Sequence, residues 1–171
     1  MRTKAFVIAT LTVVSVAVQA AGDKPSSGID APAAFARIKA LAGEWQADTQ
    51  MGKAHLTYEV IASGTSLVER ESAQNMPAMM AVYHLDGGRL LMTHYCMAGN
   101  QPRMQARAFD AKTGEVRFQF LDATNLASPE AGHMRNLTLR IGDHDHFAAD
   151  WEFYEGGQKS RTETFQYSRV R

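Results

Sequence analysis

The chain has 171 residues, of which 18 are lysine or arginine, 18 are aspartate or glutamate and one is cysteine. The formal net charge is zero and no stretch is strongly basic, which argues against a protein that binds nucleic acid or an anionic membrane surface. A single cysteine cannot form an internal disulfide, so Cys96 is a buried thiol, a ligand, a reactive thiol or an intermolecular bridge.

Residues 1–21 predict a cleaved signal peptide. Arg2 and Lys4 begin it, residues 5–18 are almost all apolar or small, and residues 18–20 have the small–x–small pattern of a cleavage site. We expect cleavage near Ala20 or Ala21 and a periplasmic or secreted mature protein. No later segment has 18 consecutive apolar residues, so we expect no membrane span after cleavage.

A flexible polar linker and a short helix are expected next. Residues 22–29 are rich in polar and small side chains, which is typical of a linker. Asp30 is placed to cap a helix that begins at Ala31 with Pro32 in its first turn, and Gly43 ends the helix.

After Gly43 the chain changes to short alternating segments separated by turn signals, which predicts strands. The expected strands are 43–51, 54–63, 65–74, 79–86, 89–96, 102–110, 115–122, 133–141, 146–155 and 158–169. Asp86-Gly87-Gly88 and Gly156-Gly157 are strong hairpin signals, and Pro77 indicates a turn over residues 75–78. About ten strands without long crossovers predict an all-β fold, an up-and-down antiparallel barrel with a short N-terminal helix. A barrel of this size leaves room for a ligand cavity, and a β-sandwich is the alternative.

Two features at the ends of the barrel point to a family. Gly43-Glu44-Trp45 opens the first expected strand, and Arg169 or Arg171 closes the last. This arrangement resembles the calycin superfamily, which includes lipocalins, fatty-acid-binding proteins and nitrobindin-like barrels. The resemblance implies that the Trp45 ring closes one end of the barrel. An arginine near the end of the last strand would lie over this ring in a cation–π contact.

The segment Thr93–Met104, T-H-Y-C-x-x-G-N-Q-P-R-M, is similar to a motif in a group of exported bacterial proteins of unknown function. The likeness extends to Leu41–Trp45 (L-A-G-x-W), Tyr83–Gly87 (Y-H-x-D-G) and the pair His133-Met134. It implies a lipocalin-like barrel over residues 30–171 and brings no known activity with it. The chain departs from nitrobindin-like haem proteins because no segment matches their proximal-histidine region.

The same segment is the candidate site, because reactive side chains are concentrated where a strand meets a loop. Alternation places His94 and Cys96 on one strand face, and we expect them inside the barrel near an open end. Asn100, Gln101 and Arg103 are expected on the loop above them, and the loop 123–132 is a candidate lid.

These residues lead to the hypothesis that the barrel binds a small, mostly apolar molecule. Arg103 would favour an anionic group on this molecule. The predicted ligand-binding residues are His94, Cys96, Asn100, Gln101, Arg103, Asn125, His133 and Trp151. The predicted apolar walls are Phe118, Phe120, Phe147, Trp151, Phe153, Met80, Val82 and Met134.

Three alternatives stay open at this point. His94, Cys96 and His133, together with many methionines, suit a soft metal such as Cu(I), and a haem is a related possibility. Cys96 beside His94 also resembles a nucleophile and its base. Finally, the cluster can have a purely structural or interaction role.

Glu69 and Glu71 share a strand face, and we expect them either to meet an arginine such as Arg103 or to face water.

Overall fold

The computed structural model describes residues 28–50 and 52–171. The expected signal peptide and most of the expected linker lie outside these residues. The elements are the helix α1 (Ala31–Lys39), a one-turn 3-10 helix (Ala62–Gly64) and ten strands. The strands are β1 (Gly43–Thr49), β2 (Gly52–Ile61), β3 (Ser66–Ala73), β4 (Met76–Asp86), β5 (Arg89–Tyr95), β6 (Gln101–Asp110), β7 (Glu115–Thr124), β8 (His133–Ile141), β9 (His146–Glu155) and β10 (Gln158–Arg169).

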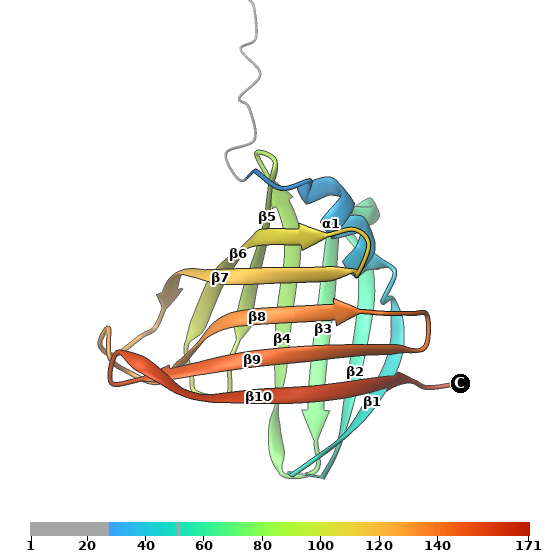
Figure 1. The fold of residues 1–171 in the computed structure, drawn as a ribbon. Coiled ribbons are helices and arrows are strands. Elements are labelled where there is room, and N and C mark those ends of the chain that lie inside the picture. The colour runs from blue at the N-terminus through green and yellow to red at the C-terminus, as the bar shows by residue number, and fades with distance from the viewer. Residues whose placement is uncertain (1–27, 51) are drawn as a thin grey trace, which may run out of the picture.

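The ten strands pair antiparallel in chain order and close into a barrel through β1 and β10 (Figure 1). This confirms the predicted all-β up-and-down barrel and rules out the sandwich. The closing seam is short: among the described residues it contains two residue pairs, Trp45 with Arg169 and Gln46 with Ser168. Neighbouring strands such as β9 and β10 pair along most of their length.

The helix α1 covers one end of the barrel (Figure 1). The Asp30 carboxylate accepts a hydrogen bond from the Ala33 N–H at 2.9 Å, which caps the first turn as predicted. Phe35 and Ile38 are buried, and the helix packs against β4, β5 and β6. No helix in the described part of the chain is long and apolar enough to cross a membrane.

Trp45 is the centre of this covered end. Its indole N–H donates to the Leu41 carbonyl at 2.7 Å, and the Arg169 guanidinium lies 4.1 Å from the ring centroid. Gly43 has φ +129°, and a Cβ there would lie 2.6 Å from Nη1 of Arg169. The contact expected between Trp45 and a late arginine is therefore made by Arg169, and a glycine at position 43 leaves space for it.

The strand predicted at 79–86 is wrong at its start, because β4 begins three residues earlier, at Met76. Pro77 was the reason for expecting a turn. In the structure the pairing of β3 with β4 is irregular between Glu71 and Ala73, opposite this segment. A proline is tolerated beside such an irregularity near the start of a strand, since no regular ladder hydrogen bond is lost.

Aromatic rings fill the half of the barrel nearest Trp45. Phe147 packs edge-on against Trp45 with centroids 4.8 Å apart, and Tyr83 packs against Phe118 at 5.8 Å. Phe118 and Phe147, expected in a cavity wall, are therefore part of the packed core.

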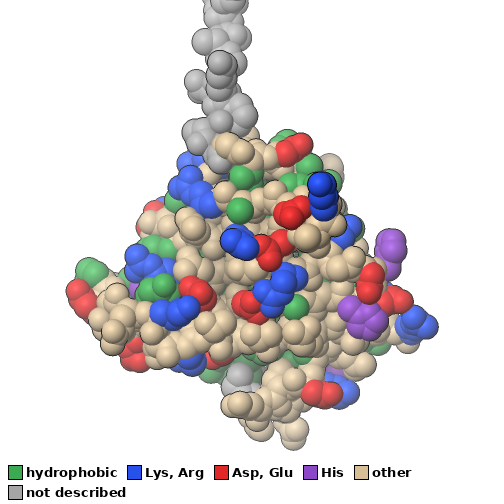
Figure 2. All heavy atoms as spheres, in the orientation of Figure 1, with side chains coloured by type: hydrophobic (Ala, Val, Ile, Leu, Met, Phe, Trp, Pro, Cys, Tyr) green, Lys and Arg blue, Asp and Glu red, His purple; other side chains and the backbone are tan. Residues whose placement is uncertain are grey.

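Charged side chains of both signs are intermixed on the face shown in Figure 2.

Candidate functional site

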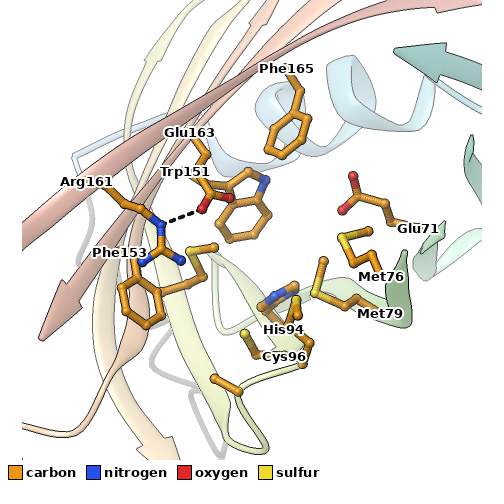
Figure 3. Close-up of a pocket in the computed structure, with 13 residues that line it drawn as sticks. Glu71, Met76, Met79, His94, Cys96, Trp151, Phe153, Arg161, Glu163 and Phe165 are labelled. Atoms are coloured by element: carbon orange, nitrogen blue, oxygen red, sulfur yellow. Dashed lines mark hydrogen bonds and ion pairs between the residues drawn. The ribbon is translucent and has the colours of Figure 1, made fainter. Parts of the chain in front are cut away.

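A cavity of about 270 Å³ lies at the end of the barrel opposite Trp45. We call it the His94 pocket (Figure 3). Its apolar wall consists of three aromatic and several sulfur-containing side chains, namely Trp151, Phe153, Phe165, Met76, Met79, Cys96, Met97 and Met134, with Ala98 beside them. Its polar lining is Glu71, His94, Arg161 and Glu163. Of the predicted walls, Trp151, Phe153 and Met134 line the pocket.

Met80 and Val82 were predicted to line the cavity, and this is wrong. Their strand neighbours Ala81 and Tyr83 are fully buried inside the barrel. Since side chains alternate along a strand, Met80 and Val82 belong to the outer face of β4, and Met79 takes the inward position instead.

His94 is the central polar group of the pocket. It is 4% exposed, and its ring lies 4.8 Å from that of Trp151. Neither of its ring nitrogens has a hydrogen-bond partner among the described residues. Burial lowers the pKa of His94 to about 4, so the imidazole is neutral at neutral pH and offers both a donor and an acceptor to a ligand.

Cys96 follows His94 on the same face. Its backbone N–H donates to the Asn100 carbonyl at 3.1 Å, and the Gly99 N–H donates to the Cys96 carbonyl at 2.9 Å, which closes a tight loop. Burial raises the pKa of the Cys96 thiol. A thiolate–imidazolium pair needs a lowered thiol pKa and a raised histidine pKa, and the pocket shifts both in the opposite directions.

Three of the predicted ligand-binding residues instead fasten two loops together. The Asn100 side chain donates to the Gly132 carbonyl at 2.9 Å, and the Asn125 side chain donates to the Gly99 carbonyl. The Thr124 hydroxyl donates to the Gln101 side chain at 2.8 Å. The first two bonds join the 96–100 loop to the 123–132 loop, and the third joins the adjoining ends of β6 and β7. Asn100, Gln101 and Asn125 are not in the wall of the His94 pocket.

Arg103 lies on the outer surface of the barrel, where it forms a two-pronged ion pair with Asp122 of β7. The neighbouring Met104 takes the inward position, so alternation turns Arg103 outward. The placement of Arg103 on a loop above His94 was therefore wrong, and this side chain lies outside the pocket that it was expected to serve.

His133 is buried, but in a different place from His94. Its Nδ1 lies 2.7 Å from the Ala131 carbonyl oxygen, and its ring lies 4.9 Å from that of Phe120. Both rings border a shallow depression under the 123–132 loop that also includes Arg135. The structure thus separates His133 and Phe120 from the His94 pocket.

Two buried carboxylates, Glu69 and Glu71, were not among the predicted ligand-binding residues, although Glu71 lines the pocket. Tyr83 donates to Glu69 at 2.6 Å, and Tyr167 donates to Glu71 at 2.7 Å. Neither glutamate meets an arginine of the described residues, and both are buried, at 5% and 6% exposed. Burial raises the pKa of Glu69, and it raises the pKa of Glu71 to about 7. The alternation of Glu69 and Glu71 with outward residues was a usable signal. Their tyrosine partners come from other strands, Tyr83 from the adjacent β4 and Tyr167 from β10.

The arginine that does reach the pocket is Arg161. Its Nε donates to Glu163 at 2.6 Å, and its guanidinium lies 4.0 Å from the centroid of the Phe153 ring (Figure 3). Both groups are at the pocket mouth, with side chains 49% and 30% exposed. The positive charge of Arg161 is therefore already matched by a carboxylate.

No family model and no curated protein matches the sequence. Among solved structures, the chain is similar to the crystal structure of Rv2717c from M. tuberculosis, with a TM-score of 0.54 and 13% sequence identity. The match covers 81% of this chain and 98% of that one. At this identity the likeness shows that the two proteins share a β-barrel fold.

Proposed function

We propose that the protein is an exported barrel that binds a small, mostly apolar molecule in the His94 pocket. The observation that carries this proposal is a buried, neutral imidazole with two unpartnered nitrogens in the wall of an apolar cavity. Leaving such a buried polar group without partners costs about 1–3 kcal/mol, and a bound ligand that hydrogen-bonds to it removes the cost. The cavity has the apolar wall and the few polar groups typical of ligand sites.

We also propose that the chain belongs to the calycin superfamily. The closed ten-strand barrel supports this placement, as does the contact of Trp45 with Arg169 beside Gly43. The proposed export depends on the signal-peptide pattern of residues 1–21. Intact-mass measurement of the mature protein tests export, since cleavage near Ala20 or Ala21 gives a defined mass.

Native mass spectrometry, together with an absorption spectrum, tests the binding function. For protein purified from its native periplasm, we expect an extra mass that is released on denaturation. Met79→Trp fills the pocket and should abolish the extra mass, whereas Val60→Trp, at an exposed position, should retain it. A clean mass for the unsubstituted protein, or an extra mass unaffected by Met79→Trp, would contradict the proposal. A Soret band would identify the bound molecule as haem.

A soft metal ion is the second candidate occupant. The unpartnered His94 shares its pocket with the thiol of Cys96 and the thioethers of Met76, Met79, Met97 and Met134. Imidazole and sulfur ligands favour Cu(I) and its analogue Ag(I). Within the described residues, no three histidine, cysteine, aspartate or glutamate side chains form a metal-binding group, so thioethers would have to complete the coordination.

Titration of the reduced protein with Ag(I) tests this candidate. If the ion binds here, Cys96→Ser should weaken the affinity by about 10- to 100-fold, on the scale of losing a supporting group at a metal site. Met104→Leu is the matched control, because Met104 is a buried sulfur residue outside the pocket. Equal affinities for the two variants would exclude a soft-metal site in this pocket.

A further inference from the structure

The charged groups that line the His94 pocket are not those expected from the sequence. Arg103 was predicted to bind the ligand, but it lies outside the pocket. The lining contains two carboxylates, Glu71 and Glu163, and one guanidinium, Arg161. Arg161 is paired with Glu163, and burial keeps His94 neutral at neutral pH. The charge left without a counter-ion among the described lining residues is therefore the carboxylate of Glu71.

Glu71 has one oxygen engaged and one available. Its Oε1 accepts the hydrogen bond from Tyr167, whereas Oε2 has no partner within the described part of the chain. Figure 3 shows the carboxylate pointing into the pocket across from Trp151 and Phe165. A buried anion that faces aromatic rings is complementary to an organic cation, which gains a charge-assisted hydrogen bond from the carboxylate and a cation–π contact from the rings.

We infer that the His94 pocket binds a ligand that carries a protonated amine on an apolar body, with Glu71 as its counter-ion. The inference rests on the proposed binding function and specifies its ligand class. The ammonium group lies against Glu71 and the face of Trp151 or Phe165, and the apolar body packs among Met76, Met79 and Phe153. Pairing with Glu71 compensates the cost of removing the cation from water, which a purely apolar pocket would not do.

Binding of the cation is linked to the ionisation of Glu71. Burial raises the pKa of Glu71 to about 7, so below neutral pH this carboxyl is largely protonated and attracts an ammonium ion poorly. The titratable and charged groups around it are Glu69 on its own strand, Tyr58 on β2, Tyr83 on β4, His94 on β5 and Cys96 just after it, and Arg161, Glu163 and Tyr167 on β10. Amine affinity should therefore fall as the pH is lowered from about 8 to about 6.

Calorimetric titration of the full chain with three probes of nearly equal size tests the inference. The probes are cyclohexylmethylamine, cyclohexylmethanol and cyclohexanecarboxylate, which are cationic, neutral and anionic at neutral pH. We expect the amine to bind at least about tenfold more tightly than the other two, which corresponds to one charge-assisted contact. The affinity for the amine should fall on acidification, while the affinity for the alcohol should stay nearly constant.

Glu71→Gln should remove the preference for the amine and leave the affinity for the alcohol within about threefold. The substituted amide keeps an oxygen that can accept the Tyr167 hydrogen bond, and circular dichroism verifies the fold. Glu59→Gln, which changes an exposed carboxylate outside the pocket, is the matched control and should retain the preference. The inference is wrong if the alcohol or the carboxylate binds as tightly as the amine, or if the preference for the amine survives Glu71→Gln. Either result would leave the proposed binding function standing. Failure of all three probes to bind would count against the pocket as a ligand site.

Discussion

Trp45→Ala should lower the free energy of unfolding by about 3–5 kcal/mol, the range for removing a large buried aromatic ring. Trp45 is 1% exposed, packs edge-on against Phe147, and loses its hydrogen bond to the Leu41 carbonyl in the variant. The substitution also removes the ring beneath Arg169, so the guanidinium loses its cation–π partner at the covered end. Urea unfolding followed by circular dichroism measures the change.

Tyr95→Ala is the matched control for Trp45→Ala. Tyr95 is an aromatic strand residue that is 45% exposed, so its removal should change the stability by no more than about 0.5 kcal/mol. A loss of stability for Trp45→Ala that is no larger than the loss for Tyr95→Ala would show that the covered end contributes little to the fold.

The second large effect is a pair of opposite pH dependences at Glu71 and His94. Burial raises the pKa of Glu71 from 4.5 to about 7. Between these values the folded protein keeps a proton that the unfolded chain has lost, so Glu71 stabilises the fold at low pH and this contribution is lost as the pH rises through 7. Burial lowers the pKa of His94 from 6.5 to about 4, so its contribution is present above pH 6.5 and is lost as the pH falls through 4. Each effect amounts to about 3 kcal/mol at full extent.

Stability curves of two variants separate these contributions. On acidification from neutral pH, Glu71→Gln should lose stability relative to the unsubstituted protein, while His94→Gln should gain relative to it. Glu69 is present in both variants, so its own titration largely cancels from the comparison. Urea unfolding at several pH values gives the two differences, and Glu59→Gln should follow the unsubstituted protein because its carboxylate is exposed and lies outside the pocket. Parallel curves for all four proteins would contradict the opposite shifts.

The barrel was predictable because its signals are local. Hairpin turns such as Asp86-Gly87-Gly88 and the alternation of each strand depend on neighbours in the sequence, and they are enough to count strands and exclude long crossovers. Pro77 misled the prediction because the irregular pairing that accommodates it forms between two strands.

The site was only partly predictable, because its chemistry depends on contacts across the barrel. His94, Cys96 and Trp151 line one pocket as expected from strand alternation. Alternation does not say which face is inside, so Met80 and Val82 were assigned to the interior. Arg103 was placed on a loop above His94, whereas it belongs to β6 and faces outward. The role of Glu71 depends on Tyr167, which is 96 residues away in the chain, and no short-range pattern indicates that pairing.

The short seam between β1 and β10 has a consequence for how the barrel holds its shape. The contact between Trp45 and Arg169 closes a loop that contains nearly all of the described chain, and the entropy cost of closing a loop rises with its length. Two residue pairs supply few hydrogen bonds to offset that cost. The indole–guanidinium contact, with the hydrogen bonds from Arg169 to the carbonyls of Ala42 and Ala40, therefore holds β10 against the start of the barrel. We expect the distant pocket to depend on this contact, since a sheet that opens at the seam no longer encloses a cavity.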